Sequence, residues 1–116
     1  MRRKHRLRAN ADFQRIRREG RTLVHPLLLV GTLPNGLEYS RFGFAVGRRL
    51  GKAVVRNRIK RRMRESVRLR IDEGKIAAGW DVVFIARGPM REASFHQVDE
   101  TIGLMLRRAS LVSDVT

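Results

Sequence analysis

Residues 52–65 read KAVVRNRIKRRMRE, and the interpretation of the whole chain starts from this stretch. It belongs to a segment from Ala53 to Ile71 that contains neither Gly nor Pro, the two residues that most often interrupt a helix. Apolar residues recur at every fourth position of this segment, at Val55, Ile59, Met63 and Val67. Because this spacing brings side chains to one face, we expect a long helix over 53–71 whose apolar face packs on a sheet.

The opposite face of the expected helix is basic. With about 100° per residue, four polar side chains fall within about 60° of one another on a helical wheel. They are Asn57, Arg61, Arg64 and Arg68, flanked by Arg58 and Glu65. A guanidinium is planar and donates hydrogen bonds in pairs, so it suits phosphate groups and the faces of nucleobases. This face is therefore expected to present a row of guanidiniums to a polyanion.

Positive charge is confined to two segments. The 116 residues include 26 Lys and Arg against 11 Asp and Glu, a net charge of +15. Residues 1–21 hold nine basic and two acidic residues, and residues 41–70 hold twelve basic residues with Glu65 as the one acid. The other stretches, 22–40, 71–90 and 91–116, each sum to −1. This uneven distribution favours a nucleic acid partner over a cationic face that serves only solubility.

The rest of the chain predicts a single α+β domain over 1–116, a two-layer sandwich of a small sheet and three helices. Residues 1–8 are expected to form a flexible basic arm, and residues 110–116 a tail. The expected elements are a helix from Asn10 to Gly20, strands over 23–33, about 39–47 and 80–86, and helices over 53–71 and from Ser94 to Ala109. A turn at Pro34-Asn35-Gly36 is expected to join the first two strands as in a hairpin, and Ser94 with Gln97 has the spacing of a capping box.

The faces of two strands can be assigned. On the strand over 39–47, Phe42, Phe44 and Val46 share one face and are expected in the core, whereas Gly43, Ala45 and Gly47 share the other. The small residues fit either a closely packed helix or a smooth groove floor along which an RNA backbone passes. Residues 80–86 (WDVVFIA) are apolar on both faces, which is typical of a covered central strand, and Trp80 is interpreted as a core residue.

The sequence does not contain a catalytic constellation. There is no Cys, the acids are scattered, and His5, His25 and His96 have no second metal ligand at a useful spacing. Residues 47–53 (GRRLGKA) lack the Ser or Thr of a phosphate-binding loop. We therefore expect no catalytic residue and no metal site in the polypeptide.

No segment indicates a membrane or export. Apolar runs such as Leu27 to Val30 are far too short to span a bilayer. No apolar stretch follows the basic N-terminus as a secretory signal requires, so the expected location is the cytoplasm.

Residues 52–65 resemble the Arg-Asn-Arg signature helix of the bacterial ribonuclease P protein subunit. Three other parts of the chain resemble that family at matching spacing: Arg6-Leu7-Arg8, Asp12-Phe13 with Gly20, and the stretch from Gly43 to Gly51. The resemblance covers most of the chain and leaves out residues 110–116.

The resemblance implies a partnership with RNA. In this family a large catalytic RNA removes the 5′ leader of precursor tRNA with divalent metal, and the protein holds the catalytic RNA and the leader. Mg²⁺ would then be bound mainly by the RNA, and no protein partner would be required. The family fold also implies a left-handed β-α-β crossover around the signature helix, as in the second domain of a small-subunit ribosomal protein, whereas chain physics alone favours the right-handed form.

The family's binding residues map onto this sequence in two groups. The contacts to the catalytic RNA map onto Arg56, Asn57, Arg58, Lys60, Arg61, Arg64 and Arg68. The leader-binding cleft maps onto Phe13, Arg17, Gly43, Ala45, Gly47 and Arg49. Arg17 and Gly31 stand where relatives often have aromatic residues, so leader binding is expected to depend more on charge and to show a steeper salt dependence.

Some interpretations stay open at this point. Phe13 suits base stacking or the core, and Arg56 suits either RNA contact or support of the helix start. The alternative function is a non-enzymatic RNA-binding protein of ribosomal or chaperone-like type. A self-sufficient nuclease would cut RNA without an RNA partner, and a DNA-compacting protein would prefer duplex DNA.

Overall fold

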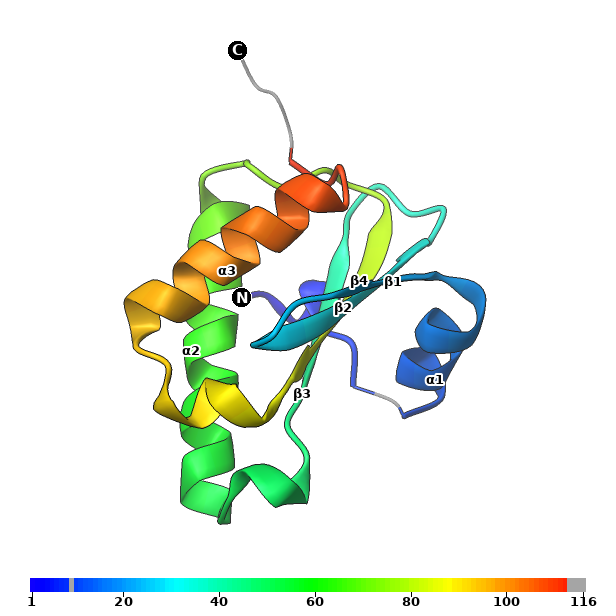
Figure 1. The fold of residues 1–116 in the computed structure, drawn as a ribbon. Coiled ribbons are helices and arrows are strands. Elements are labelled where there is room, and N and C mark those ends of the chain that lie inside the picture. The colour runs from blue at the N-terminus through cyan, green and yellow to red at the C-terminus, as the bar shows by residue number, and fades with distance from the viewer. Residues whose placement is uncertain (9, 113–116) are drawn as a thin grey trace.

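The computed structural model describes residues 1–8 and 10–112. Its sheet carries helices on both faces, with α1 (Asn10–Glu19) on one side and α2 (Ala53–Asp72) and α3 (Phe95–Arg108) on the other (Figure 1). The strands are β1 (Arg21–Val24), β2 (Leu28–Pro34), β3 (Arg41–Ala45) and β4 (Trp80–Ala86). The described residues also form three short 3₁₀ helices, which are η1 (Arg3–His5), η2 (Arg48–Leu50) and η3 (Gly88–Glu92). The α+β class is confirmed, but α1 adds a layer that the two-layer prediction did not contain.

The strand order is β1-β2-β4-β3, which places β4 in the interior of the sheet. β4 pairs antiparallel with β2 and parallel with β3. Val82 and Phe84 on one face of β4 belong to the core beneath α2 and α3, and Val83 on the other face belongs to the core beneath α1. The prediction of a central strand covered on both sides is therefore confirmed. Trp80, at its start, is half-buried and packs against the larger core.

The turn at residues 34–36 does reverse the chain, but the expected hairpin is wrong because β4 lies between β2 and β3. A strand that is apolar on both faces gains most from the interior position, where helices cover both sides. β3 and β4 are adjacent and parallel, and α2 lies in the connection between them. The left hand of this crossover stays a prediction.

The single strand expected over 23–33 is in fact a hairpin of β1 and β2. Pro26 has no backbone N–H and interrupts the run. The reversal is closed by the His25 N–H, which donates to the Leu28 carbonyl at 3.0 Å, and by the Leu27 N–H, which donates to His25 Nδ1 at 3.0 Å. A proline inside an apolar run is the sequence signal for this break.

The helix pair α2 and α3 closes the larger core. Ile59, Met63 and Val67 of α2 are buried as predicted, and Val55 is partly buried against the same cluster. Of the apolar residues of the last helix, Val98, Ile102, Met105 and Ala109 are buried, whereas Phe95 is exposed. The predicted capping box is confirmed, since the Gln97 N–H donates to Ser94 Oγ at 3.1 Å and the Ser94 N–H donates to Gln97 Oε1 at 2.8 Å.

The N-terminal segment lies against the sheet, which differs from the flexible arm expected at residues 1–8. The Leu7 side chain is buried, and its N–H donates to the Phe42 carbonyl at 2.8 Å. His5 Nδ1 lies 2.9 Å from the Ser40 carbonyl oxygen. An apolar side chain between two arginines anchors the segment here, and it brings Arg6 and Arg8 to a fixed place beside β3.

Candidate nucleic-acid interface

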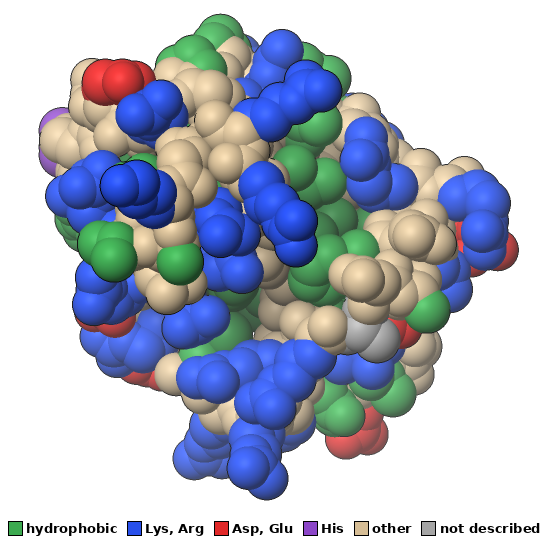
Figure 2. Space-filling model, turned by 90° about the horizontal axis from the view of Figure 1, so that it is seen from below, with side chains coloured by type: hydrophobic (Ala, Val, Ile, Leu, Met, Phe, Trp, Pro, Cys, Tyr) green, Lys and Arg blue, Asp and Glu red, His purple; other side chains and the backbone are tan. Residues whose placement is uncertain are grey.

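A cleft runs between α1, β3 and α2. One hollow of about 400 Å³ lies between the N-terminal segment, β3 and α2, and a second of about 310 Å³ lies between α1 and the end of β3. The two share Asn10, Phe13, Ala45 and Val46, so they form one continuous groove. Figure 2 shows this hollowed face as an apolar strip bordered by clusters of Lys and Arg side chains.

The small residues Gly43, Ala45 and Gly47 were expected either to allow close packing of a helix or to form the floor of an open groove, and the structure shows both. Gly43 is buried beneath Phe13, and a Cβ atom there would overlap Cε1 of the ring and lie 2.6 Å from Cζ. Ala45 and Gly47, in contrast, line the open groove, and a Cβ atom at Gly47 would meet nothing within 4 Å. Gly43 thus permits close packing of α1, and Ala45 and Gly47 form the smooth floor.

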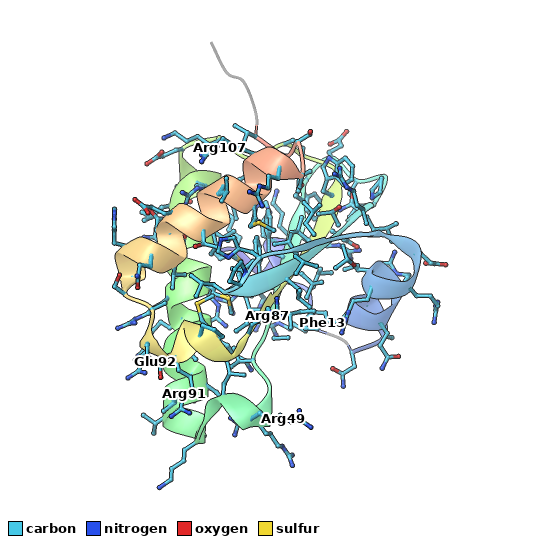
Figure 3. The ribbon with its side chains drawn as sticks, viewed as in Figure 1. Phe13, Arg49, Arg87, Arg91, Glu92 and Arg107 are labelled. Carbon is cyan, nitrogen blue, oxygen red and sulfur yellow. The ribbon has the colours of Figure 1, made fainter. Side chains whose placement is uncertain are left out.

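Phe13 is half-buried and lines both hollows. It lies on the side of α1 that faces the sheet (Figure 3). One part of the ring packs on Gly43 while the rest borders the groove, so Phe13 takes part in packing and its role in base stacking stays a prediction. Arg17, one turn further along α1, is exposed and lines the second hollow.

The rim of the first hollow is a cluster of cations. Its basic lining residues come from the N-terminal segment and from α2, and they are Arg6, Arg8, Lys60 and Arg64. None of the residues that line it is an Asp or Glu. Burial lowers the pKa of Arg64, and the nearby charges of Arg6 and Arg8 lower it further. Arg6 Nε is buried and has no hydrogen-bond partner among the described residues. Such a group of like charges is stabilised by a bound anion.

Two members of this cluster were absent from the predicted site. Arg6 and Arg8 were assigned to a flexible arm, although Leu7 between them was the apolar residue that could anchor it. Lys60 and Arg64, assigned to the catalytic RNA, line the same groove as Phe13. The two predicted groups of residues therefore meet in one cleft.

The outer row of α2 is exposed at Asn57, Arg58 and Arg61. Within the described part of the chain, the side chains of Asn57 and Arg61 make no hydrogen bond or ion pair. Arg58 makes one long contact, 3.5 Å from Nη2 to the Arg91 carbonyl oxygen. η3 thereby brings Arg91 beside the row, and Arg49 lies at the same end of the molecule (Figure 3). Arg49 is exposed but lines neither hollow, so the structure does not place it in the cleft.

Arg68 and Arg56 differ from the rest of the predicted RNA-binding row. Arg68 donates to Glu65 through Nη2 at 2.6 Å and Nε at 3.0 Å, and to Asp72 through Nη1 at 2.8 Å. The hydrogen bonds that Arg68 donates to Glu65 lower the pKa of Glu65 and raise the pKa of Arg68. Arg56 donates through Nε to the Gly51 carbonyl at 3.2 Å, which supports the helix start.

The carboxylates that the structure describes are not gathered at one place. No group of three His, Asp or Glu side chains with the geometry of a metal site occurs among the residues that the structure describes. Asp81, which is fully buried, is paired with Arg15 and Arg41, and Asp99 is paired with Arg70. Within the described ranges, no helix combines the length and apolar character needed to cross a membrane.

Comparison with known proteins gives a consistent result. The sequence model of the family described as Ribonuclease P matches residues 1–110. The ribonuclease P protein component of Roseiflexus castenholzii is 49% identical over 97% of this chain and 91% of the relative. That of Herpetosiphon aurantiacus is 43% identical over 98% of this chain and 91% of the relative.

Solved structures agree with the sequence comparisons. The RNase P protein of Staphylococcus aureus superposes with a TM-score of 0.84 and 32% identity, covering 94% of this chain and 98% of that one. The RNase P protein of Thermotoga maritima gives a TM-score of 0.78 and 37% identity, covering 89% and 96%.

Proposed function

Because the chain belongs to the ribonuclease P protein family, we propose that it binds the catalytic RNA of ribonuclease P and the 5′ leader of precursor tRNA at the same time. The family is that of a subunit of a tRNA-processing endonuclease whose partner is the ribonuclease P RNA. We infer from the family a cytoplasmic location and a reaction in which the RNA, with its Mg²⁺, carries out the cleavage.

The observation that carries this proposal is the cleft. A single-stranded leader needs a surface on which bases stack and cations that follow its backbone. The groove provides the Phe13 ring and the floor of Ala45 and Gly47, with Arg6, Arg8, Lys60 and Arg64 along one side. The absence of any acidic residue from the lining of the larger hollow supports an anionic ligand in particular.

The outer row of α2 supports the second contact. Asn57, Arg58 and Arg61 point away from the cores and are exposed. A rigid helix that holds guanidiniums in a row positions them on an RNA backbone without ordering a loop. The cleft and the row lie on adjacent faces of α2, so one protein would hold the leader against the catalytic RNA. The polypeptide would supply binding and charge neutralisation.

The experiment that tests this proposal compares two ligands of the reconstituted complex. Precursor tRNA with a 5′ leader and mature tRNA are bound to the catalytic RNA alone and to the RNA with the protein. We expect the protein to increase affinity for the precursor and to leave affinity for mature tRNA nearly unchanged. Equal effects on the two ligands would refute leader binding and would favour a general RNA-binding protein of ribosomal or chaperone-like type.

A further inference from the structure

Asp81 is the one charged residue of the central strand, and it is fully buried. A buried carboxylate is costly unless hydrogen bonds and opposite charges compensate it. In the sequence it stands in a run that is otherwise apolar, WDVVFIA, where an aliphatic residue would serve the sheet as well. The cost of an ionised side chain at this place requires an explanation beyond packing.

Four donors from three other parts of the chain converge on this carboxylate. Oδ1 accepts from Arg41 Nε at 2.8 Å and from Asn35 Nδ2 at 3.0 Å. Oδ2 accepts from Arg41 Nη2 at 2.7 Å and from Arg15 Nη2 at 2.9 Å. Arg41 and Asn35 belong to β3 and to the loop before it, so they tie the carboxylate to its own sheet. Arg15 belongs to α1, and its bond therefore crosses from the sheet to the helix.

α1 continues into β1 at its end and otherwise packs on the sheet mainly through one apolar side chain. Ile16 is its one fully buried side chain, and it packs with Val83 and Leu7 in the smaller core. A single buried residue lets a helix pivot about the contact. Two further contacts fix it: the Phe13 ring on Gly43 and the Arg15 bond to Asp81. On a helical wheel with about 100° per residue, Phe13 and Arg15 lie on opposite sides of Ile16, so the three contacts together set how α1 is turned on the sheet.

We propose that Asp81 is a positioning residue for the leader cleft, acting through Arg15 to hold α1 in the orientation that places Phe13 over Gly43. Phe13 and Arg17, two of the residues that α1 contributes to the groove, each lie two positions from Arg15 along the chain. A change in the rotation of α1 therefore changes the groove wall. This inference rests on the proposed function for its consequence in leader binding, but the positioning itself is independent of RNA.

The test uses Arg15→Gln in the full-length protein, with Arg18→Gln as the matched control. Both substitutions remove one positive charge from α1, and Arg18 is exposed and lines neither hollow of the cleft. Asp81 keeps Arg41 and Asn35 in the Arg15→Gln variant, so the sheet retains its buried ion pair. Arg15→Lys restores the charge and one donor, and it serves as the rescue variant.

The first measurement needs no RNA. The Gly43 Hα that occupies the Cβ position points at the Phe13 ring, so its NMR chemical shift reports how α1 is docked. We expect this shift to move toward its random-coil value in Arg15→Gln, to stay in Arg18→Gln and to return in part in Arg15→Lys. An unchanged shift in Arg15→Gln would overturn the positioning role.

The second measurement is the affinity of the reconstituted complex for precursor tRNA relative to mature tRNA. We expect Arg15→Gln to reduce this ratio by about fivefold or more relative to Arg18→Gln, the lower end of what one base–aromatic stack contributes. A moved Gly43 shift with the same ratio in both variants would overturn the link to the leader. If the unmodified protein itself shows no preference for the precursor, the proposed function fails, and the Gly43 shift alone decides the positioning role.

Discussion

Arg61 and Arg68 lie two turns apart on α2 and carry the same charge, but only Arg68 is already paired with neighbouring acids. An RNA phosphate reaches Arg61 without displacing any partner within the described structure, whereas it must compete with Glu65 and Asp72 for Arg68. Arg61→Gln is expected to weaken binding to the catalytic RNA by about 1–3 kcal/mol, the range for one lost charge-assisted phosphate contact, which corresponds to about 5- to 150-fold. It should also reduce the slope of log K against log salt by about 0.7–0.9.

The matched variant is Glu65→Gln combined with Arg68→Gln, which removes the ion pair and leaves the net charge unchanged. We expect its affinity for the catalytic RNA and its salt slope to equal those of the unmodified protein. The assay is equilibrium binding to the catalytic RNA over a series of salt concentrations, with a single-stranded leader as the second ligand. A loss in the double variant as large as that in Arg61→Gln, or an equal loss of leader binding in Arg61→Gln, would refute the division of α2 into an outer row and an internal pair.

Three further outcomes are expected. Phe13→Ala should weaken leader binding by about 1–3 kcal/mol, the contribution of one stacked base, and leave binding to the catalytic RNA unchanged, as measured with the two RNAs separately. If the cleft covers about 5–8 phosphates, log K for leader binding should fall against log salt with a slope of roughly −3.5 to −6. A slope shallower than that of a relative with aromatic residues at positions 17 and 31 would contradict the prediction that leader binding depends more on charge than on stacking. Burial alone would raise the pKa of Asp81, but hydrogen bonds from Arg41, Asn35 and Arg15 outweigh burial, and the pKa is lowered. The ionised carboxylate therefore stabilises the fold above its unfolded pKa of about 3.9, and this contribution is lost as the pH falls through the folded pKa. Asp81→Asn should accordingly reduce the fall of Tm at acid pH, as measured by thermal unfolding over a pH series.

The elements that the sequence predicted well are those set by local patterns. α2 follows from residue periodicity, β4 from a short run that is apolar on both faces, and the start of α3 from the Ser94 and Gln97 pair. Each of these signals lies within a few residues of the structure it specifies. The pairing of Arg68 with Glu65 and Asp72 was equally local, at spacings of three and four residues. This pairing could be predicted from the sequence, and it distinguishes Arg68 from Arg61 as a candidate RNA contact.

The features that were missed depend on contacts between distant parts of the chain. Strand pairing placed β4 between β2 and β3, which no turn signal between those two strands can specify. Arg15, Arg41 and Asn35 meet Asp81 across 40 to 66 residues of sequence. The cluster of Arg6 and Arg8 with Arg64 likewise depends on where Leu7 is buried. Charge counts located the two basic segments, whereas the tertiary fold determines which of their arginines share a cleft.

Cleavage of precursor tRNA at low magnesium tests most directly the claim that the polypeptide binds and the RNA cuts. The three reactions contain the catalytic RNA alone, the protein alone, and both together. We expect slow cleavage by the RNA, faster cleavage by the mixture and none by the protein. Cleavage by the purified protein at a rate comparable to that of the mixture, or a mixture no faster than the RNA alone, would contradict the account.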